Sequence, residues 1–135
     1  MKLVGFNFMK ISGEKKAEIS KELKINSNID IKDIKKLKQE FFKAKQDLIE
    51  IDFNYTISYN PDVGSIILEG KLVLAMESKE LKDALKSWES KELSDDFKIP
   101  LFNLILRKSS VKAFEIEEEL NLPLHMPLQR IQKKE

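Results

Sequence analysis

Few residues in this 135-residue chain are of the types that catalyse reactions or bind transition metals. The sequence has one histidine, His125, and no cysteine, so it offers no His/Cys set for a zinc or iron site. A Ser-His-Asp triad would have to use the same histidine, which lies between two prolines near the C-terminus. We therefore expect no catalytic residues, no metal and no cofactor. We expect His125 to be a packing or surface residue.

Four glutamates near the C-terminus are the other possible source of acid–base or cation chemistry: Glu115, Glu117, Glu118 and Glu119. Carboxylates this close together in sequence spread around a helix and do not converge on one point. The expectation is a solvated helix face without catalysis.

Arginine is rare here, because Arg107 and Arg130 stand against 22 lysines. A guanidinium group forms planar, bidentate hydrogen bonds that lysine cannot form. A specific role is one interpretation, in which an arginine binds the C-terminal tail or an acidic partner. An ordinary exposed arginine is an equally good one.

The chain ends in an apolar stretch that contains two prolines, Pro123 and Pro127, which disfavour a helix. We expect residues 121–135 to form an extended tail that packs back onto the domain, since prolines lower the entropy cost of fixing it. Its apolar row is also suited to closing a groove for a partner. The candidate partner-binding residues are Leu122, Leu124, Met126, Leu128, Arg107 and Arg130.

The composition indicates one folded domain, residues 1–135, with a heavily charged surface: 41% of residues are hydrophobic and 35% are charged. The net charge of +1 gives no global field that would attract nucleic acid. Residues 10–45 nevertheless hold eleven lysines against six acids, a local excess of +5. This region is either a solvated face or a basic surface for nucleic acid or the ribosome.

The absence of cysteine and the short, interrupted apolar run at the N-terminus give no sign of secretion or of a membrane span. We expect a cytoplasmic protein that does not interact with membranes.

The clearest structural pattern is central. Apolar and polar residues alternate from Ile49 to Tyr59 and again from Ile66 to Met76, with the turn sequence "NPDVG" between them. Strict period-two alternation on both sides of a turn predicts a long antiparallel hairpin with one buried face.

The flanking segments predict further strands and then helices. We expect one strand at the N-terminus, a second up to about Ile31, and a short helix or helical turn over residues 33–44. Ser78 is the expected N-cap of a helix that buries Leu81, Ala84, Leu85 and Trp88. A second helix is expected to start between Ser94 and Ile99, because Pro100 either delays the start or kinks the helix. Ser109-Ser110 is expected to mark a break in it. The helix should end at Asn121.

The fold class that follows is α+β: an antiparallel sheet built around the hairpin, with C-terminal helices packed on one face.

Two families share features with this sequence. Its "YNPDVG" turn, its "ILRK" helix segment and its "LPLHMPL" ending resemble a family of small uncharacterised archaeal proteins, for which no activity is implied. The order of elements, and "IPLF" followed by "NLPLHMPL", also resemble the SecB export-chaperone fold. The residues that carry this second resemblance are Pro100, Leu101, Phe102, Leu106, Arg107, Leu122, Pro123 and Pro127.

The first functional hypothesis is a non-enzymatic, SecB-like chaperone or adaptor. It would hold extended apolar polypeptide or a protein partner between the sheet and the C-terminal helix and tail, and it would form homo-oligomers. The alternative is a nucleic-acid or ribosome-associated module that uses residues 10–45.

Overall fold

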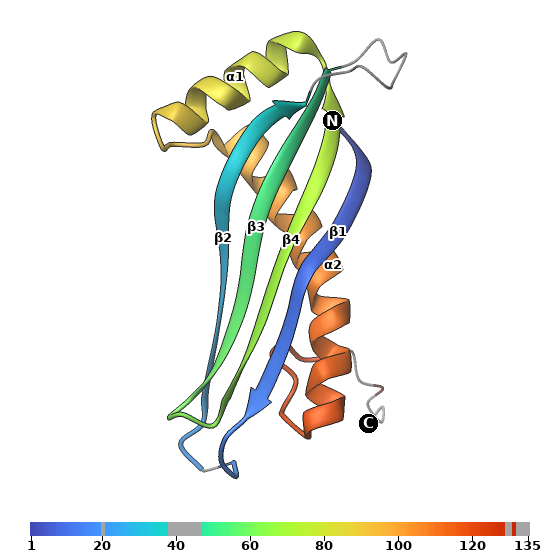
Figure 1. Cartoon of the computed structure of the whole chain (residues 1–135). Helices are drawn as coiled ribbons and strands as arrows, with labels where there is room; N and C mark the ends of the chain where they lie inside the picture. The colour runs from blue at the N-terminus through green and yellow to red at the C-terminus, as the bar shows by residue number, and fades with distance from the viewer. Residues whose placement is uncertain (20, 38–46, 129–130, 132–135) are drawn as a thin grey trace.

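A computed structural model describes residues 1–19, 21–37, 47–128 and 131 of the chain. These residues form four strands and two helices, with the α+β architecture expected (Figure 1). The elements are β1 (Lys2–Lys15), β2 (Lys24–Leu37), β3 (Asp47–Asn60), β4 (Gly64–Met76), α1 (Ser78–Glu89) and α2 (Asp95–Leu120).

The strands form one antiparallel sheet in the order β1-β4-β3-β2. The β3–β4 hairpin predicted from the alternation is therefore central and is confirmed. Its inward side chains, from Ile49 to Tyr59 and from Ile66 to Met76, are almost fully buried. Their neighbours in sequence point to the opposite face. Of the turn residues, Asp62 adopts a positive φ of 44°, whereas no glycine does.

A glycine at the centre of β4 makes room for an aromatic cluster. Gly70 pairs with Phe8 and with Phe53, whose ring packs against the rings of Phe6 and Phe8. A Cβ atom on Gly70 would lie 2.6 Å from the Phe53 ring, well inside van der Waals contact. Gly70 is therefore required by close packing on the covered face of the sheet.

The expected helix over residues 33–44 is wrong where the structure tests it, because β2 continues to Leu37. The strand register shifts between Ile31 and Asp33, which places one extra residue in β2. Ile31 and Ile34 pair with Phe53 and Ile51, so both face the same side although they are three positions apart. The bulge thus places two apolar residues of a strand three positions apart on one face, a spacing that is typical of a helix. Residues 38–44 lie outside the described part of the chain.

The two helices begin and end close to the expected positions, with three corrections. The N-cap of α1 is Glu77, and Ser78 is its first helical residue. The second helix begins at Asp95 and includes Pro100, so the delayed start is wrong. It also runs without a break through Ser109-Ser110, whose side chains are buried against the sheet.

The C-terminal end of α2 is as expected. Asn121 adopts the left-handed conformation, with φ at 53°, and caps the helix. The backbone N–H of Leu122 then donates to the carbonyl of Glu117, which turns the chain back toward the sheet.

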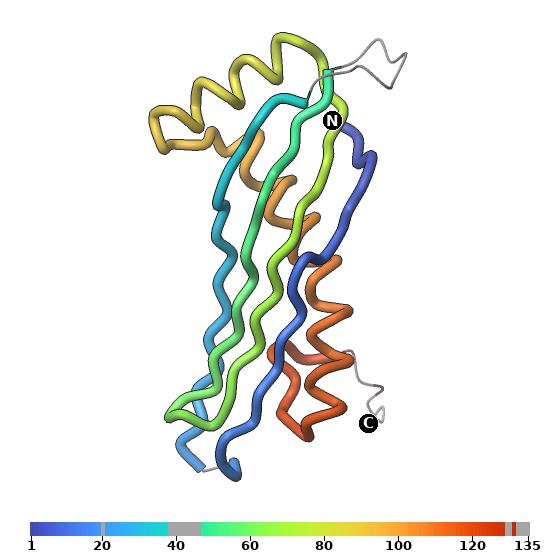
Figure 2. Tube along the Cα trace, viewed as in Figure 1, coloured from blue at the N-terminus to red at the C-terminus, as the bar shows by residue number. Residues whose placement is uncertain are grey.

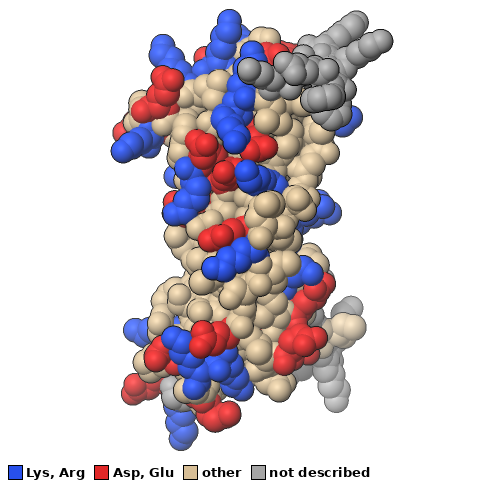
Figure 3. Space-filling model, in the orientation of Figure 1, with Lys and Arg blue, Asp and Glu red and all other residues tan. Residues whose placement is uncertain are grey.

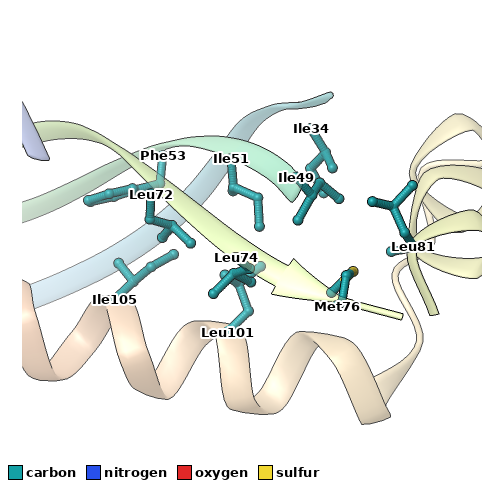
Figure 4. Close-up of a cluster of buried hydrophobic side chains, with 11 residues drawn as sticks. Ile34, Ile49, Ile51, Phe53, Leu72, Leu74, Met76, Leu81, Leu101 and Ile105 are labelled. Atoms are coloured by element: carbon teal, nitrogen blue, oxygen red, sulfur yellow. The ribbon is translucent and has the colours of Figure 1, made fainter. Parts of the chain in front are cut away.

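Helix α2 runs along one face of the sheet, and α1 lies across the end of the sheet, where it packs on the core of that same face (Figures 1 and 2). The core consists of two clusters. The first lies where α1 and the start of α2 meet the sheet and includes Ile49, Leu81 and Leu101 (Figure 4). The second lies under the C-terminal half of α2 and contains Tyr55, Tyr59, Ala113 and Leu122. The expectation of helices packed on one face is confirmed.

The other face of the sheet is open and polar. Lys71 lies 3.5 Å from Glu50 and 3.8 Å from Asp52 on this face, and Lys35 lies 3.3 Å from Glu50. Basic and acidic side chains are intermixed across it (Figure 3).

Candidate partner-binding site

The residues proposed from the sequence occupy very different environments. Leu122 is only 5% exposed, Leu124 and Met126 are half-buried, and Leu128 is 56% exposed. The tail therefore rises from the core toward the surface along its length. Arg107 is exposed on α2, and Arg130 lies outside the described residues.

A buried carboxylate holds the tail against the domain. Glu117 is completely buried, and it accepts hydrogen bonds from the Tyr59 hydroxyl and from the backbone N–H of His125, the latter at 2.9 Å. The Tyr59 hydroxyl oxygen also lies 2.9 Å from the carbonyl oxygen of Pro123. One glutamate thus connects α2, the central strand β3 and the tail.

The His125 side chain, 1% exposed, completes this arrangement. Its Nδ1 atom lies 3.0 Å from a Glu117 oxygen, and its Nε2 atom lies 3.3 Å from Ser110 Oγ. The ring also packs against Phe114, with 5.0 Å between ring centroids. His125 is therefore a packing residue.

Glu117 corrects the prediction that all four glutamates are solvated. The other three are exposed, whereas Glu117 belongs to a fully buried stripe on α2 that repeats every four residues: Leu101, Ile105, Ser109, Ala113 and Glu117. This spacing was present in the sequence and is the signal that could have identified the buried carboxylate.

Ser110, His125 and Glu117 stand in the order of a hydrolase triad, but the arrangement supports packing and not catalysis. All three are buried, so a substrate has no access to the serine oxygen. Ser110 also lies in the middle of a helix, where backbone N–H groups are engaged in helical hydrogen bonds and cannot stabilise an oxyanion. Burial, together with the hydrogen bond to Glu117, raises the pKa of Tyr59 above its usual value.

The two edges of the sheet differ in character. The outer edge strand β2 carries charged or amide side chains at most exposed positions, which discourages pairing with another chain. The edge strand β1 instead exposes apolar residues: Val4 is 49% exposed, Met9 61% and Ile11 52%. Val4 and Met9 lie at the two register shifts of β1, which is why they escape the alternation of the strand.

A groove runs beside this apolar edge. It has a volume of about 340 Å³ and lies between β1 and the last turns of α2. Ile11, Ile116 and Leu120 supply its apolar surface, and Lys112, Glu115 and Glu119 supply its polar rim. Gly13 lines it too, and a Cβ atom there would clash with Ile116, so the strand and helix are in close contact.

The basic region between residues 10 and 45 is partly neutralised in its described portion. Lys15, Lys16, Lys32 and Lys35 each lie within 4 Å of a carboxylate: Glu18, Asp62, Asp30 and Glu50, respectively. Among the described residues, no group of histidine, aspartate and glutamate side chains is arranged to hold a metal ion, and no helix is long and apolar enough to cross a membrane.

The overall arrangement is similar to that of a Mycobacterium tuberculosis SecB-like chaperone, Rv1957, solved in complex with a ChAD peptide from the HigA1 antitoxin. The TM-score is 0.52 at 10% sequence identity, and the match covers 99% of this chain and 92% of the other. No protein-family model and no curated protein matches the sequence. The comparison therefore shows a SecB-like fold.

Proposed function

We propose that this protein is a non-enzymatic, SecB-like chaperone or adaptor that binds extended apolar polypeptide along the edge strand β1. The observation that carries the proposal is the coincidence of an unpaired sheet edge, three exposed apolar residues and an adjoining groove. An extended segment can pair its backbone with β1 and place alternate side chains over the groove. The fold similarity to a chaperone solved with a bound peptide supports this function.

The apolar C-terminal row belongs to the same proposal. Leu124, Met126 and Leu128 are partly or largely exposed and are available to a partner, as is Arg107. Leu122 is packed into the core and would become available only if the tail moved. The roles of these residues and of Arg130 in partner binding stay predictions. The same holds for the division into one domain and a tail, for cytoplasmic location and for membership of the small archaeal family.

Self-association is the second part of the proposal. In the absence of peptide, an edge strand with exposed apolar residues can pair with the same strand of a second copy, so self-association and peptide binding compete for β1. Sedimentation velocity of the wild type and of Met9→Lys tests this. A homo-oligomer that dissociates in the variant is the expected result.

The peptide-binding proposal is tested with a fluorescein-labelled nonapeptide of alternating serine and leucine, which carries no charged side chains. We expect its anisotropy to rise with protein concentration, and Ile11→Lys to weaken binding about tenfold because a charge then lies in the groove. Val111→Lys is the matched control, because Val111 is 59% exposed on α2 and does not line the groove.

A version of the peptide with alternate N-methylated backbone amides tests pairing with the strand, because it lacks half of the N–H donors. Equal affinity of the two peptides, or equal weakening by the two variants, would contradict binding along β1.

The described residues give no specific support to the nucleic-acid or ribosome alternative, because four lysines of the region have carboxylate neighbours. Filter binding with a salt series tests it: a steep loss of affinity with salt would support it.

A further inference from the structure

A second groove lies at the opposite end of the molecule from the turn between β3 and β4. It has a volume of about 500 Å³ and lies between α1 and the first two turns of α2. A neighbouring hollow of about 440 Å³ shares two of its residues, Asp83 and Ser94, so the two form one continuous depression along α1. This depression is separate from the groove beside β1.

The floor of the groove is apolar. Met76 and Ala84 are buried at its base, with 2% and 4% of their surface exposed. Phe97 and Pro100 form the wall on the side of α2. An apolar side chain of a partner would lose water here and gain contacts with these residues.

The rim is acidic. Glu80 and Asp83, three positions apart on one side of α1, and Asp96 on α2 line the groove. The cations beside them are Lys86, which lines the neighbouring hollow, and the N-terminal amine of Met1, so acidic groups outnumber basic ones among the described lining residues. Because proline has no N–H, Pro100 cannot donate to the carbonyl of Asp96, which leaves a further acceptor on this wall. The groove thus presents apolar surface and acceptors to a ligand. Its complement is an apolar surface flanked by cationic donors.

The elements that form the groove restrict the shape of the partner. Two of its walls are helices, whose backbone N–H and C=O groups are largely used within the helix. Among the described residues, the sheet contributes only Met76, the last residue of the central strand β4, and Met1 lies just before β1. An extended segment would find no backbone to pair with, so its own polar groups would stay unsatisfied. A helix satisfies its backbone internally and fits a groove between two other helices.

We propose that the groove between α1 and α2 is a docking site for a basic amphipathic helix of a partner protein. Apolar residues of that helix lie on Phe97 and Pro100, above the buried Met76 and Ala84, and its lysine or arginine side chains lie over Glu80, Asp83 and Asp96. This site is independent of the peptide binding proposed for β1.

The test uses a fluorescein-labelled amphipathic helix of 18 leucine and lysine residues and measures its anisotropy on titration with the full chain. Two matched peptides accompany it: one has glutamate in place of lysine, and the other has two central prolines that prevent a helix. We expect the helical basic peptide to bind at least about tenfold more tightly than either, and its affinity to fall with salt.

Two pairs of variants locate the binding. Glu80→Gln/Asp83→Asn/Asp96→Asn removes three groove charges, and Glu89→Gln/Glu92→Gln/Glu118→Gln removes three exposed charges elsewhere. Pro100→Lys puts a cation in the groove wall, and Ile99→Lys puts one beside it, on a residue that is 57% exposed. In each pair, we expect the first variant to weaken binding about tenfold and the second to change it less than twofold.

Thermal unfolding of all four variants confirms that they are folded. The proposal is overturned if the two variants of each pair bind the basic helical peptide equally. It is also overturned if the proline-containing peptide binds the wild type as tightly as the helical one. If the groove variants change the sedimentation of the protein without peptide, the groove is an interface between copies and the proposal is wrong. None of these outcomes affects the uncharged peptide or Ile11→Lys, so the two binding proposals fail separately.

Discussion

Glu117 is the residue whose environment differs most from the expectation for its type. Burying a carboxylate costs free energy unless hydrogen bonds replace its water. Here the Tyr59 hydroxyl and the His125 backbone N–H donate to it, and the imidazole lies 3.0 Å away. Because these partners come from β3 and from the tail, the cost of burial is offset only when the tail occupies this one position. The carboxylate thus selects a single path for residues 122–126.

The ionisation of Tyr59, which donates to Glu117, makes the stability of the protein depend on pH. Its folded-state pKa lies above the ordinary value of 10.0, first because of burial and then because of Glu117. The stabilisation of its protonated form is therefore fully present below pH 10 and is lost as pH rises toward the raised pKa. We predict that Tyr59→Phe destabilises the protein at pH 8, but that the wild type loses about 1.4 kcal/mol more than the variant between pH 8 and pH 11.

Urea unfolding of both proteins at a series of pH values measures this difference. Lysines titrate in both proteins, so their contribution cancels when the two free energies of unfolding are subtracted. A difference between the two proteins that does not change with pH would show that Tyr59 ionises as freely in the folded protein as in the unfolded chain.

Among the elements, the strands illustrate how a bulge and a glycine set the local structure. The bulge in β2 keeps Ile31 and Ile34 on the covered face. On β4, Gly70 allows the Phe53 ring to lie directly against the strand. Both features serve the covered face alone, because that is where the helices pack.

We predict that Gly70→Ala destabilises the protein by about 1–3 kcal/mol, because the added methyl group overlaps the Phe53 ring and the packed cluster cannot move away freely. Gly5→Ala on β1 is the control. A Cβ atom there meets nothing within 4 Å, so we expect a change within about 0.5 kcal/mol. Chemical denaturation measures both, and equal effects would show that the aromatic cluster yields to the methyl group.

At the scale of the whole molecule, a long sheet has helices on one face only. The two core clusters lie at different places along the sheet, and each needs its own cover. Helix α1 and the start of α2 cover the first. The second depends on the end of α2 and on the tail, through Leu122.

We predict that Leu122→Ala costs about 2–5 kcal/mol of stability, the range for a buried leucine truncated in a packed core. Leu128→Ala, at a residue that is 56% exposed, should change stability by no more than about 0.5 kcal/mol. Urea unfolding curves of the two variants separate a tail that completes the core from one that only rests on it. Similar small effects in both would contradict the structural role of the tail.

The sequence by itself determined the central hairpin, the α+β class, the helix end at Asn121 and the single buried face, because these follow from local periodicity and capping. It left the start of α2 open between Ser94 and Ile99. It also limited the chemistry, since one histidine and no cysteine leave few catalytic constellations. It failed at residues 33–37 and at Glu117. A bulge between strands produced the spacing of a helix, and a carboxylate was buried by partners 58 and 8 positions away. Only the tertiary structure decided those features, the apolar edge of β1 and both grooves, because each arises where segments distant in sequence meet.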